Sequence, residues 1–238
     1  NPFGYKFSWS PRGVLLAGKN PAHYRWDGQD VSIPGDELFD HYWTVPVEVE
    51  GKVIGFDGYP NRDSLPYMQT YGITSPATFF RGTLRYAGWC QTLRKIADLG
   101  LLDEKPLDGA PVSTFAQFTA KLIGSEGHNL RAALAAYLDL SLDSPVLDHL
   151  AWLGLLSNDP LPAGQTAPID ILTARMLEKM VYQPGERDML VLRHEFQAEY
   201  SDHQERITST MVDFGIPNGT TSMARTVGLP AAIAVAMI

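Results

Sequence analysis

The sequence predicts a mixed α+β (α/β) domain in which a largely antiparallel sheet is flanked by helices and interrupted by an all-helical subdomain. Strand and hairpin patterns fill the first part of the 238-residue chain, disappear from about residue 102 to 183, and return from Arg187. We therefore expect one α/β part formed by residues 1–101 and 184–238, with a helical insert at residues 102–183.

The chain begins with signals for a short helix and two hairpins. Ser10 followed by proline is a good helix start, with the serine as N-cap and the proline in the first turn. Asp27-Gly28 predicts a two-residue turn in one hairpin, and Glu50-Gly51 predicts a turn in a second hairpin. Residues 58–64 follow directly and are expected to form a loop because they are rich in turn formers.

Residues 81–86, Arg-Gly-Thr-Leu-Arg-Tyr, predict the strand on which the functional interpretation depends. Side chains alternate along a strand, so Arg81, Thr83 and Arg85 share one face, and Phe80, Leu84 and Tyr86 share the other, which can face a core. A guanidinium binds a carboxylate through two parallel hydrogen bonds, so the polar face indicates a site for a small dicarboxylate or tricarboxylate. A half-exposed strand with solvated arginines explains the same pattern.

Helical spacing dominates the segment after this strand. A helix is expected from Trp89 to Leu99, ended by Gly100. The two histidines of the insert, His128 and His149, are interpreted as structural. The helices expected in the insert span residues 114–123, 129–140, 145–155 and 169–182.

The last part of the chain predicts an antiparallel strand pair and a helix. Alternation indicates strands at residues 189–200 and 207–214, joined by residues 201–204. A helix over residues 220–238 follows, and Pro230 is placed to bend it. Because the far end of that helix is apolar on nearly all sides, we expect the chain to be a fragment whose last helix packs against a part not included here.

Composition excludes several classes of function. The net charge is −8 without a basic block, which argues against nucleic acid as a partner. The single cysteine, Cys90, excludes an internal disulfide and suits a reducing compartment, so we expect a cytoplasmic protein in which this thiol packs rather than reacts. No signal peptide is visible, and the apolar run at residues 227–238 is too short to span a membrane.

Motifs for self-contained catalysis are not found in the sequence. There is no GxGxxG after a strand, no phosphate loop and no GxSxG elbow. His194, Glu195, Glu199 and His203 do not have the spacing of a metalloprotease helix, and the two glutamates point away from His194 on a strand, so no metal is expected. We therefore assign no catalytic residue to this chain.

Five stretches together resemble the saccharopine dehydrogenase family, in its NADP-linked, glutamate-forming reductase type. In chain order these are residues 1–13 (NPFGYKFSWSPRG), 59–64 (YPNRDS), 81–86 (RGTLRY), 185–189 (GERDM) and 223–232 (MARTVGLPAA). The resemblance implies an oxidoreductase of lysine metabolism and amino-acid biosynthesis. Such an enzyme reversibly oxidises the CH–NH group of saccharopine to give glutamate and aminoadipate semialdehyde.

The resemblance also implies a division of labour. The family's Rossmann domain, with its NADP (or NAD) site and its acid/base residues, would lie outside this chain, which would be the substrate-binding domain and inactive alone. Carried over by motif, the substrate contacts are Trp9, Arg62, Thr83 and Arg85. Second-tier candidates are Ser8, Ser10, Arg12 and Arg81.

Other readings stay open at this point. Similarity fades in the helical insert, so a related opine-type or carboxyspermidine-type dehydrogenase, which reduces a similar imine, is one alternative. A non-catalytic interaction module with the same fold is another. Saccharopine and glutamate are the expected small-molecule partners, and a homodimer is an option that the sequence does not decide.

Overall fold

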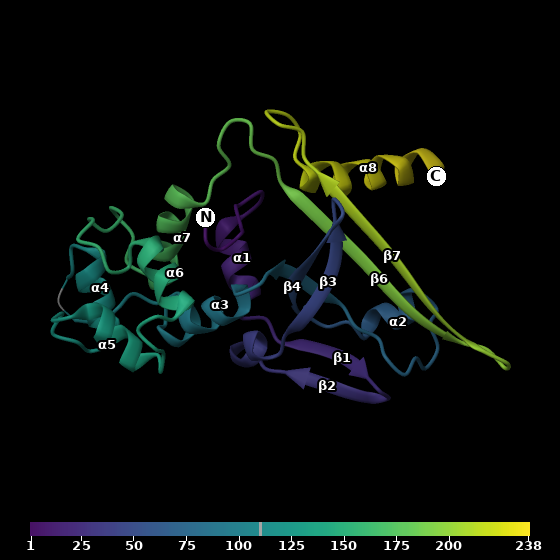
Figure 1. Ribbon diagram of the computed structural model, residues 1–238, viewed down its shortest axis with the longest axis horizontal. Coiled ribbons are helices and arrows are strands. Elements are labelled where there is room, and N and C mark those ends of the chain that lie inside the picture. Colours follow the sequence, from purple (N-terminus) through teal and green to yellow (C-terminus); the bar gives the residue numbers. More distant parts are fainter. Residues whose placement is uncertain (110) are drawn as a thin grey trace. The chain divides into compact units, whose positions relative to one another are not determined.

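A computed structural model describes residues 1–109 and 111–238 of the chain. It combines helices with small antiparallel sheets, which confirms the mixed helix-and-sheet class (Figure 1). The chain divides into two compact units, and each is described separately. The first consists of Asn1–Tyr5, Ser10–Val45 and Gly55–Met180, and the second of Lys6–Trp9, Pro46–Ile54 and Val181–Ile238.

The first unit opens with the predicted short helix and hairpin. Helix α1 (Pro11–Ala17) starts where expected, because the Ser10 hydroxyl accepts a hydrogen bond of 3.3 Å from the Gly13 N–H. Strands β1 (Ala22–Trp26) and β2 (Gln29–Ile33) pair antiparallel. The turn residues Asp27 and Gly28 have φ of 48° and 79°, as a tight hairpin turn of this kind requires. A 3-10 helix, η1 (Gly35–Asp40), follows.

A three-stranded sheet with the order β3-β4-β5 carries the functional motifs. Its strands are β3 (Trp43–Val49), β4 (Lys52–Pro60) and β5 (Gly82–Tyr86), and the tip of the β3–β4 hairpin is counted with the second unit. The prediction of a loop from Gly58 was wrong for the first three residues, which complete β4. Tyr59 pairs with Thr83 and Pro60 with Gly82, and Pro60 is tolerated because it ends the strand.

Helices complete the first unit (Figure 1). Helix α3 buries Trp89, Leu93 and Ile96 on one side, which is the spacing that predicted it. The later helices of this unit contribute buried apolar side chains, among them Phe115 and Leu147, which are at most 1% exposed. The helices are α2 (Pro66–Thr70), α3 (Trp89–Asp98), α4 (Phe115–Leu122), α5 (Leu130–Tyr137), α6 (Pro145–Leu153) and α7 (Pro168–Lys179).

All four helices expected in the insert are present, each slightly shorter than the expected range. They belong to the same compact unit as β1, β2 and β5, so the boundaries of a separate helical insert stay a prediction. His149 of α6 is hydrogen-bonded through Nδ1 to the Thr92 hydroxyl at 2.7 Å, and burial lowers its pKa. His128 is exposed.

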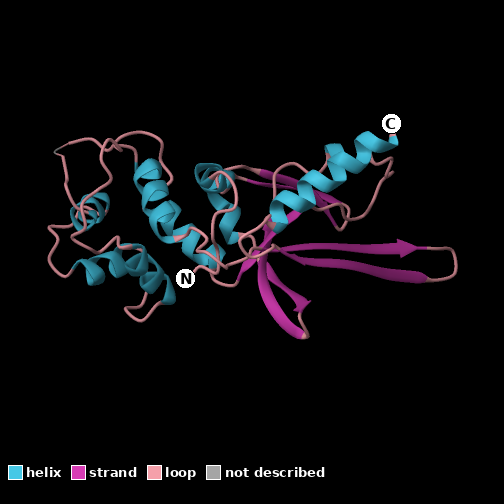
Figure 2. Ribbon diagram, turned by 90° about the horizontal axis from the view of Figure 1, so that it is seen from above, coloured by secondary structure: helices cyan, strands magenta, loops and turns pink. Residues whose placement is uncertain are grey.

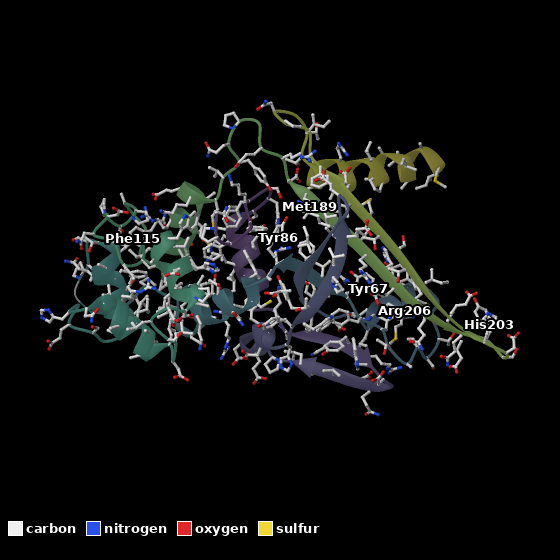
Figure 3. The ribbon with its side chains drawn as sticks, viewed as in Figure 1. Tyr67, Tyr86, Phe115, Met189, His203 and Arg206 are labelled. Atoms are coloured by element: carbon white, nitrogen blue, oxygen red, sulfur yellow. The ribbon has the colours of Figure 1, made fainter. Side chains whose placement is uncertain are left out.

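The second unit is built on a long two-stranded ribbon. Strands β6 (Met189–Glu199) and β7 (Gln204–Phe214) pair antiparallel over their whole length, as predicted, and β7 starts three residues earlier than expected (Figure 2). His203 lies at the turn and Arg206 just after it (Figure 3). The ribbon face that holds Leu192 and Phe196 is exposed to solvent at both residues.

Helix α8 (Ser222–Met237) begins on the other end of this ribbon. The buried Asp188 carboxylate accepts hydrogen bonds from the N–H groups of Ser222 (2.7 Å) and Met223 (2.9 Å), and Asp213 pairs with Arg225. The GERDM and MARTVGLPAA stretches therefore fix the start of this helix. Within the described chain the far end of α8 is exposed, with Val235 at 76%.

Candidate functional site

The arginines of the chain fall into two groups. Nine of the twelve lie within 4.0 Å of a carboxylate oxygen, which is expected in an acidic chain. The three that form no ion pair with any described residue are Arg62, Arg81 and Arg85. These are the arginines of the YPNRDS and RGTLRY stretches, so three of the four arginines named as site candidates have no internal anion, whereas the fourth, Arg12, is paired. The paired ones are Arg12, Arg25, Arg94, Arg131, Arg175, Arg187, Arg193, Arg206 and Arg225.

Backbone hydrogen bonds hold Arg62 close to the start of the RGTLRY stretch. The residue has φ of 57°, a left-handed conformation that is uncommon for a residue with a side chain. Its carbonyl accepts from the His23 N–H at 3.0 Å, and the N–H of Asn61 donates to the Arg81 carbonyl at 3.0 Å. The side chain of Arg62 is exposed. The loop is thus fixed from two sides while the guanidinium stays available.

Arg81 lies just before β5 and packs on an aromatic ring. Its guanidinium carbon is 4.3 Å from the centroid of the Tyr67 ring, a side chain labelled in Figure 3. The Arg81 N–H donates to the buried Ser64 hydroxyl at 3.0 Å. A cation stacked on a tyrosine keeps its edge free for an anion, since the ring occupies only one face of the guanidinium.

Thr83 faces a buried tyrosine across the sheet. The Thr83 hydroxyl forms a hydrogen bond with the Tyr59 hydroxyl, and the two residues are paired in register. Burial raises the pKa of Tyr59, while the nearby Arg85 charge and this hydrogen bond oppose the shift. Because a hydroxyl has one donor and two acceptor positions, Thr83 can bind Tyr59 and a ligand oxygen together.

Arg85 is the most enclosed of the three unpaired arginines. Its guanidinium carbon lies 5.0 Å from the Tyr5 ring centroid and 5.6 Å from that of Trp89. One terminal nitrogen donates to the Leu84 carbonyl at 2.9 Å. The Arg85 Nε is buried and has no hydrogen-bond partner among the described residues.

The two faces of β5 differ from the expectation. Tyr86, expected to face a core, is 38% exposed, although it packs on Phe56. Thr83 and Arg85 instead lie directly beside two buried residues of the neighbouring strand β4, Tyr59 and Asp57, which are their partners in register. The prediction of an apolar inner face was therefore wrong for Tyr86, whereas Leu84 is half-buried and Phe80 packs on Tyr24 and Trp43.

The remaining candidates have different surroundings. The Ser10 hydroxyl caps α1, and Arg12 is held by Asp170 at 3.0 Å and Glu104 at 2.8 Å, contacts that raise its pKa. Ser8 and Trp9 belong to the second unit, where Trp9 is 46% exposed. The structure therefore gathers Arg62, Arg81, Thr83 and Arg85, and gives Ser10 and Arg12 structural contacts.

Cys90 and Glu195 are two further residues whose side chains are reactive or charged. Cys90 is buried, and desolvation together with the neighbouring Asp57 charge raises the pKa of its thiol, which keeps it protonated. Glu195 on the ribbon is bound by Arg193 at 2.7 Å and Arg206 at 2.8 Å. No group of three or more His, Cys, Asp or Glu side chains within residues 1–109 and 111–238 is arranged to hold a metal ion.

Fold and geometry together define an α/β domain that presents unpaired guanidinium groups beside a threonine hydroxyl, an arrangement suited to ligands with several carboxylates. The chain matches the family model of the saccharopine dehydrogenase C-terminal domain over residues 1–238. It belongs to the saccharopine dehydrogenase family.

Individual relatives support this membership. The chain is 38% identical to a saccharopine dehydrogenase [NADP(+), L-glutamate-forming] of Schizosaccharomyces pombe, over 100% of this chain and 54% of that protein. It is 37% identical to the mitochondrial alpha-aminoadipic semialdehyde synthase of Bos taurus, over 100% of this chain and 26% of that protein. The chain thus spans about half or a quarter of the length of these relatives.

A solved structure has the same fold. The apo, histidine-tagged saccharopine dehydrogenase (L-Glu forming) from Saccharomyces cerevisiae superposes with a TM-score of 0.84 at 36% identity. The match covers 99% of this chain and 54% of that one. No described helix is both long and apolar enough to cross a membrane.

Proposed function

We propose that this chain is the substrate-binding domain of an NADP-dependent saccharopine dehydrogenase of the glutamate-forming type. The reaction converts saccharopine, NADP⁺ and water into glutamate, aminoadipate semialdehyde and NADPH with release of a proton, and it is reversible. The observation that carries the proposal is the set of three arginines without an internal carboxylate in a chain where the other nine are paired.

The chemistry of the substrate fits these residues. Saccharopine has three carboxylates, and Arg62, Arg81 and Arg85 offer three guanidinium groups for them. The Thr83 hydroxyl adds a neutral donor between Arg81 and Arg85. Charge-assisted hydrogen bonds of this kind orient a flexible substrate, which lowers the entropy cost of bringing its reacting carbon to the site of chemistry. The binding role of Trp9, which belongs to the second unit, stays a prediction.

The described residues do not fit a dinucleotide site. Such a site needs a Gly-rich turn between a parallel strand and a helix, whereas the described strands pair antiparallel in three small sheets. We therefore assign no residue of this chain to NADP binding. NADP, the hydride acceptor, would bind to a Rossmann domain outside these residues. The chain matches only about half of the length of the fungal relative, which supports this arrangement. Cytoplasmic location and a homodimer stay predictions.

The test is an assay of the protein in its natural full length, combined with calorimetry. NADP-dependent oxidation of saccharopine, and binding of saccharopine tighter than that of glutamate, would support the proposal, because saccharopine engages more of the three arginines. If the enzyme oxidised only an amine-rich opine or a carboxyspermidine-type substrate, the protein would instead be a related opine-type or carboxyspermidine-type dehydrogenase. Absence of any imine-linked oxidation would refute it.

A further inference from the structure

Two buried donors next to each other have no hydrogen-bond partner among the residues that the structure describes. They are the Arg85 Nε and the Trp89 Nε1. The Trp89 side chain is 3% exposed, and the Arg85 guanidinium carbon lies 5.6 Å from its ring centroid. Buried donors are rarely left unpaired in folded proteins, so each one requires an explanation. Two at one place indicate a shared partner.

The surroundings of this pair offer no internal partner among the described residues. The nearest acidic residue in register is Asp57, directly across from Arg85. One of its oxygens, Oδ2, accepts from the N–H groups of Gly88 at 3.1 Å and Cys90 at 3.0 Å, and Asp57 forms no ion pair with Arg85. The third side of the pair is the Tyr5 ring, whose centroid is 4.9 Å from that of Trp89 and which also lies under the Arg85 guanidinium.

We infer that Trp89 is a further ligand-binding residue, whose indole N–H and the Arg85 Nε–H together hold one carboxylate of the ligand. The inference rests on the proposed function, and it identifies a residue that the motif comparison did not. A carboxylate has two oxygens, each of which accepts an N–H at about 2.9 Å, so it can satisfy two neighbouring donors at once. Indole nitrogen is a donor only, so the subsite excludes ammonium groups.

The pair also defines what this subsite selects. Arg85 supplies the positive charge and Trp89 a neutral donor in a largely apolar setting, where a hydrogen bond is electrostatically stronger than in water. An amide in place of the carboxylate would lose the charge attraction to Arg85. Its N–H groups would also face the N–H groups of Arg85 and Trp89, which are donors as well. Because both donors are buried, the inference requires the half-buried Tyr5 side chain beside them to shift when the carboxylate binds.

The experiment uses the natural full-length protein with Trp89→Phe, which keeps the aromatic ring and removes only the N–H. We expect saccharopine to bind about 10- to 100-fold more weakly, the effect of losing one hydrogen bond to a charged group. The matched control is Trp152→Phe, whose ring packs on Phe3 and lies under the Lys179 ammonium, and which should leave affinity unchanged. In ¹⁵N-tryptophan-labelled protein, the Trp89 indole proton should shift downfield on addition of saccharopine.

The outcomes separate the two proposals. Unchanged affinity of Trp89→Phe and an unmoved Trp89 indole signal during saturable saccharopine binding would overturn this inference and leave the proposed function standing. Absence of saccharopine binding in the unmodified protein would overturn both. If Trp89→Phe does not fold, the indole titration still decides, because the signal can be assigned by elimination with variants of the other four tryptophans.

Discussion

Asp57 and Arg85 lie directly opposite each other on β4 and β5, yet they form no ion pair. The Asp57 carboxylate instead accepts the N–H groups of Gly88 and Cys90 at the start of α3, where the positive end of the helix dipole favours a negative charge. The helix start thus takes the carboxylate that would otherwise neutralise Arg85. The positive charge stays available for a ligand because the acid across the sheet is already engaged.

Replacing Asp57 should therefore affect stability first. Asp57→Ala removes the acceptor of two buried or half-buried N–H groups, and we expect a loss of about 1–3 kcal/mol in the free energy of unfolding. Asp57→Asn keeps an acceptor oxygen and should lose less. Urea unfolding measures both, with Asp30→Ala on the exposed β1–β2 hairpin as the control. Equal stability of Asp57→Ala and the unmodified protein would show that the contact contributes nothing.

Arg62 should contribute to substrate affinity and little to stability. Its side chain is exposed and forms no ion pair among the described residues, so Arg62→Ala should weaken saccharopine binding by about 1.5–3 kcal/mol without lowering the melting temperature. Arg131→Ala, which breaks a pair with Asp148 in the helical part, is the matched control and should bind normally. Calorimetry decides, and an unchanged Kd would remove Arg62 from the site.

Lysine should not replace arginine at position 85. Arg85→Lys keeps the charge but loses the planar fork and its stacking between Tyr5 and Trp89. We expect a KM for saccharopine raised about tenfold or more. Arg94→Lys, whose native arginine pairs with Asp40 and Asp98, provides the comparison. A lysine variant with native KM would show that charge alone suffices at this position.

Thr83→Val should reveal the second role of the threonine hydroxyl. The valine leaves the buried Tyr59 hydroxyl without this hydrogen bond, so the protein should lose about 1–3 kcal/mol of stability as well as substrate affinity. Thr83→Ser keeps the hydroxyl and should restore most of both. A loss of affinity that serine does not rescue would point to the methyl group rather than the hydroxyl.

Alkaline pH should destabilise the protein through Cys90. The folded state raises the pKa of this thiol, whereas the unfolded chain titrates near the ordinary value of about 8.5. Above that pH the unfolded state releases a proton that the folded state retains, so stability is complete below about pH 8.5 and falls as pH rises. Unfolding free energies of Cys90→Ala should lack this slope between about pH 8.5 and 10. An identical slope in both proteins would contradict it.

Local patterns predicted most of the elements. Ser10-Pro11, the two hairpin turns and the spacing from Trp89 to Ile96 each involve residues close in sequence, and α1, β1–β2 and α3 were found where expected. The end of β4 was missed because Tyr59 and Pro60 have turn-forming neighbours, and only their pairing with Thr83 and Gly82 makes them a strand. That pairing joins segments more than 20 residues apart.

The state of the arginines could not be predicted in the same way. Arg12 was a second-tier candidate for substrate binding, yet Asp170, far away in the sequence, holds it. Likewise, nothing local showed that Trp89 would leave a buried N–H unpaired beside Arg85. The motifs identified candidate residues, whereas the presence or absence of an internal carboxylate beside each of them depends on partners that only the folded chain brings together.

The separation of paired and unpaired arginines has a consequence for the speed of ligand capture. Because most arginines are neutralised by carboxylates, the electrostatic field far from the surface is determined by the net charge of −8. An approaching anionic ligand is therefore repelled before it reaches a guanidinium. Salt screens the distant charges within about 8–10 Å and the enclosed contacts much less. Raising ionic strength from low values should therefore quicken the encounter of this domain with a net-anionic ligand that carries several carboxylates, even as each bound carboxylate is held a little less firmly.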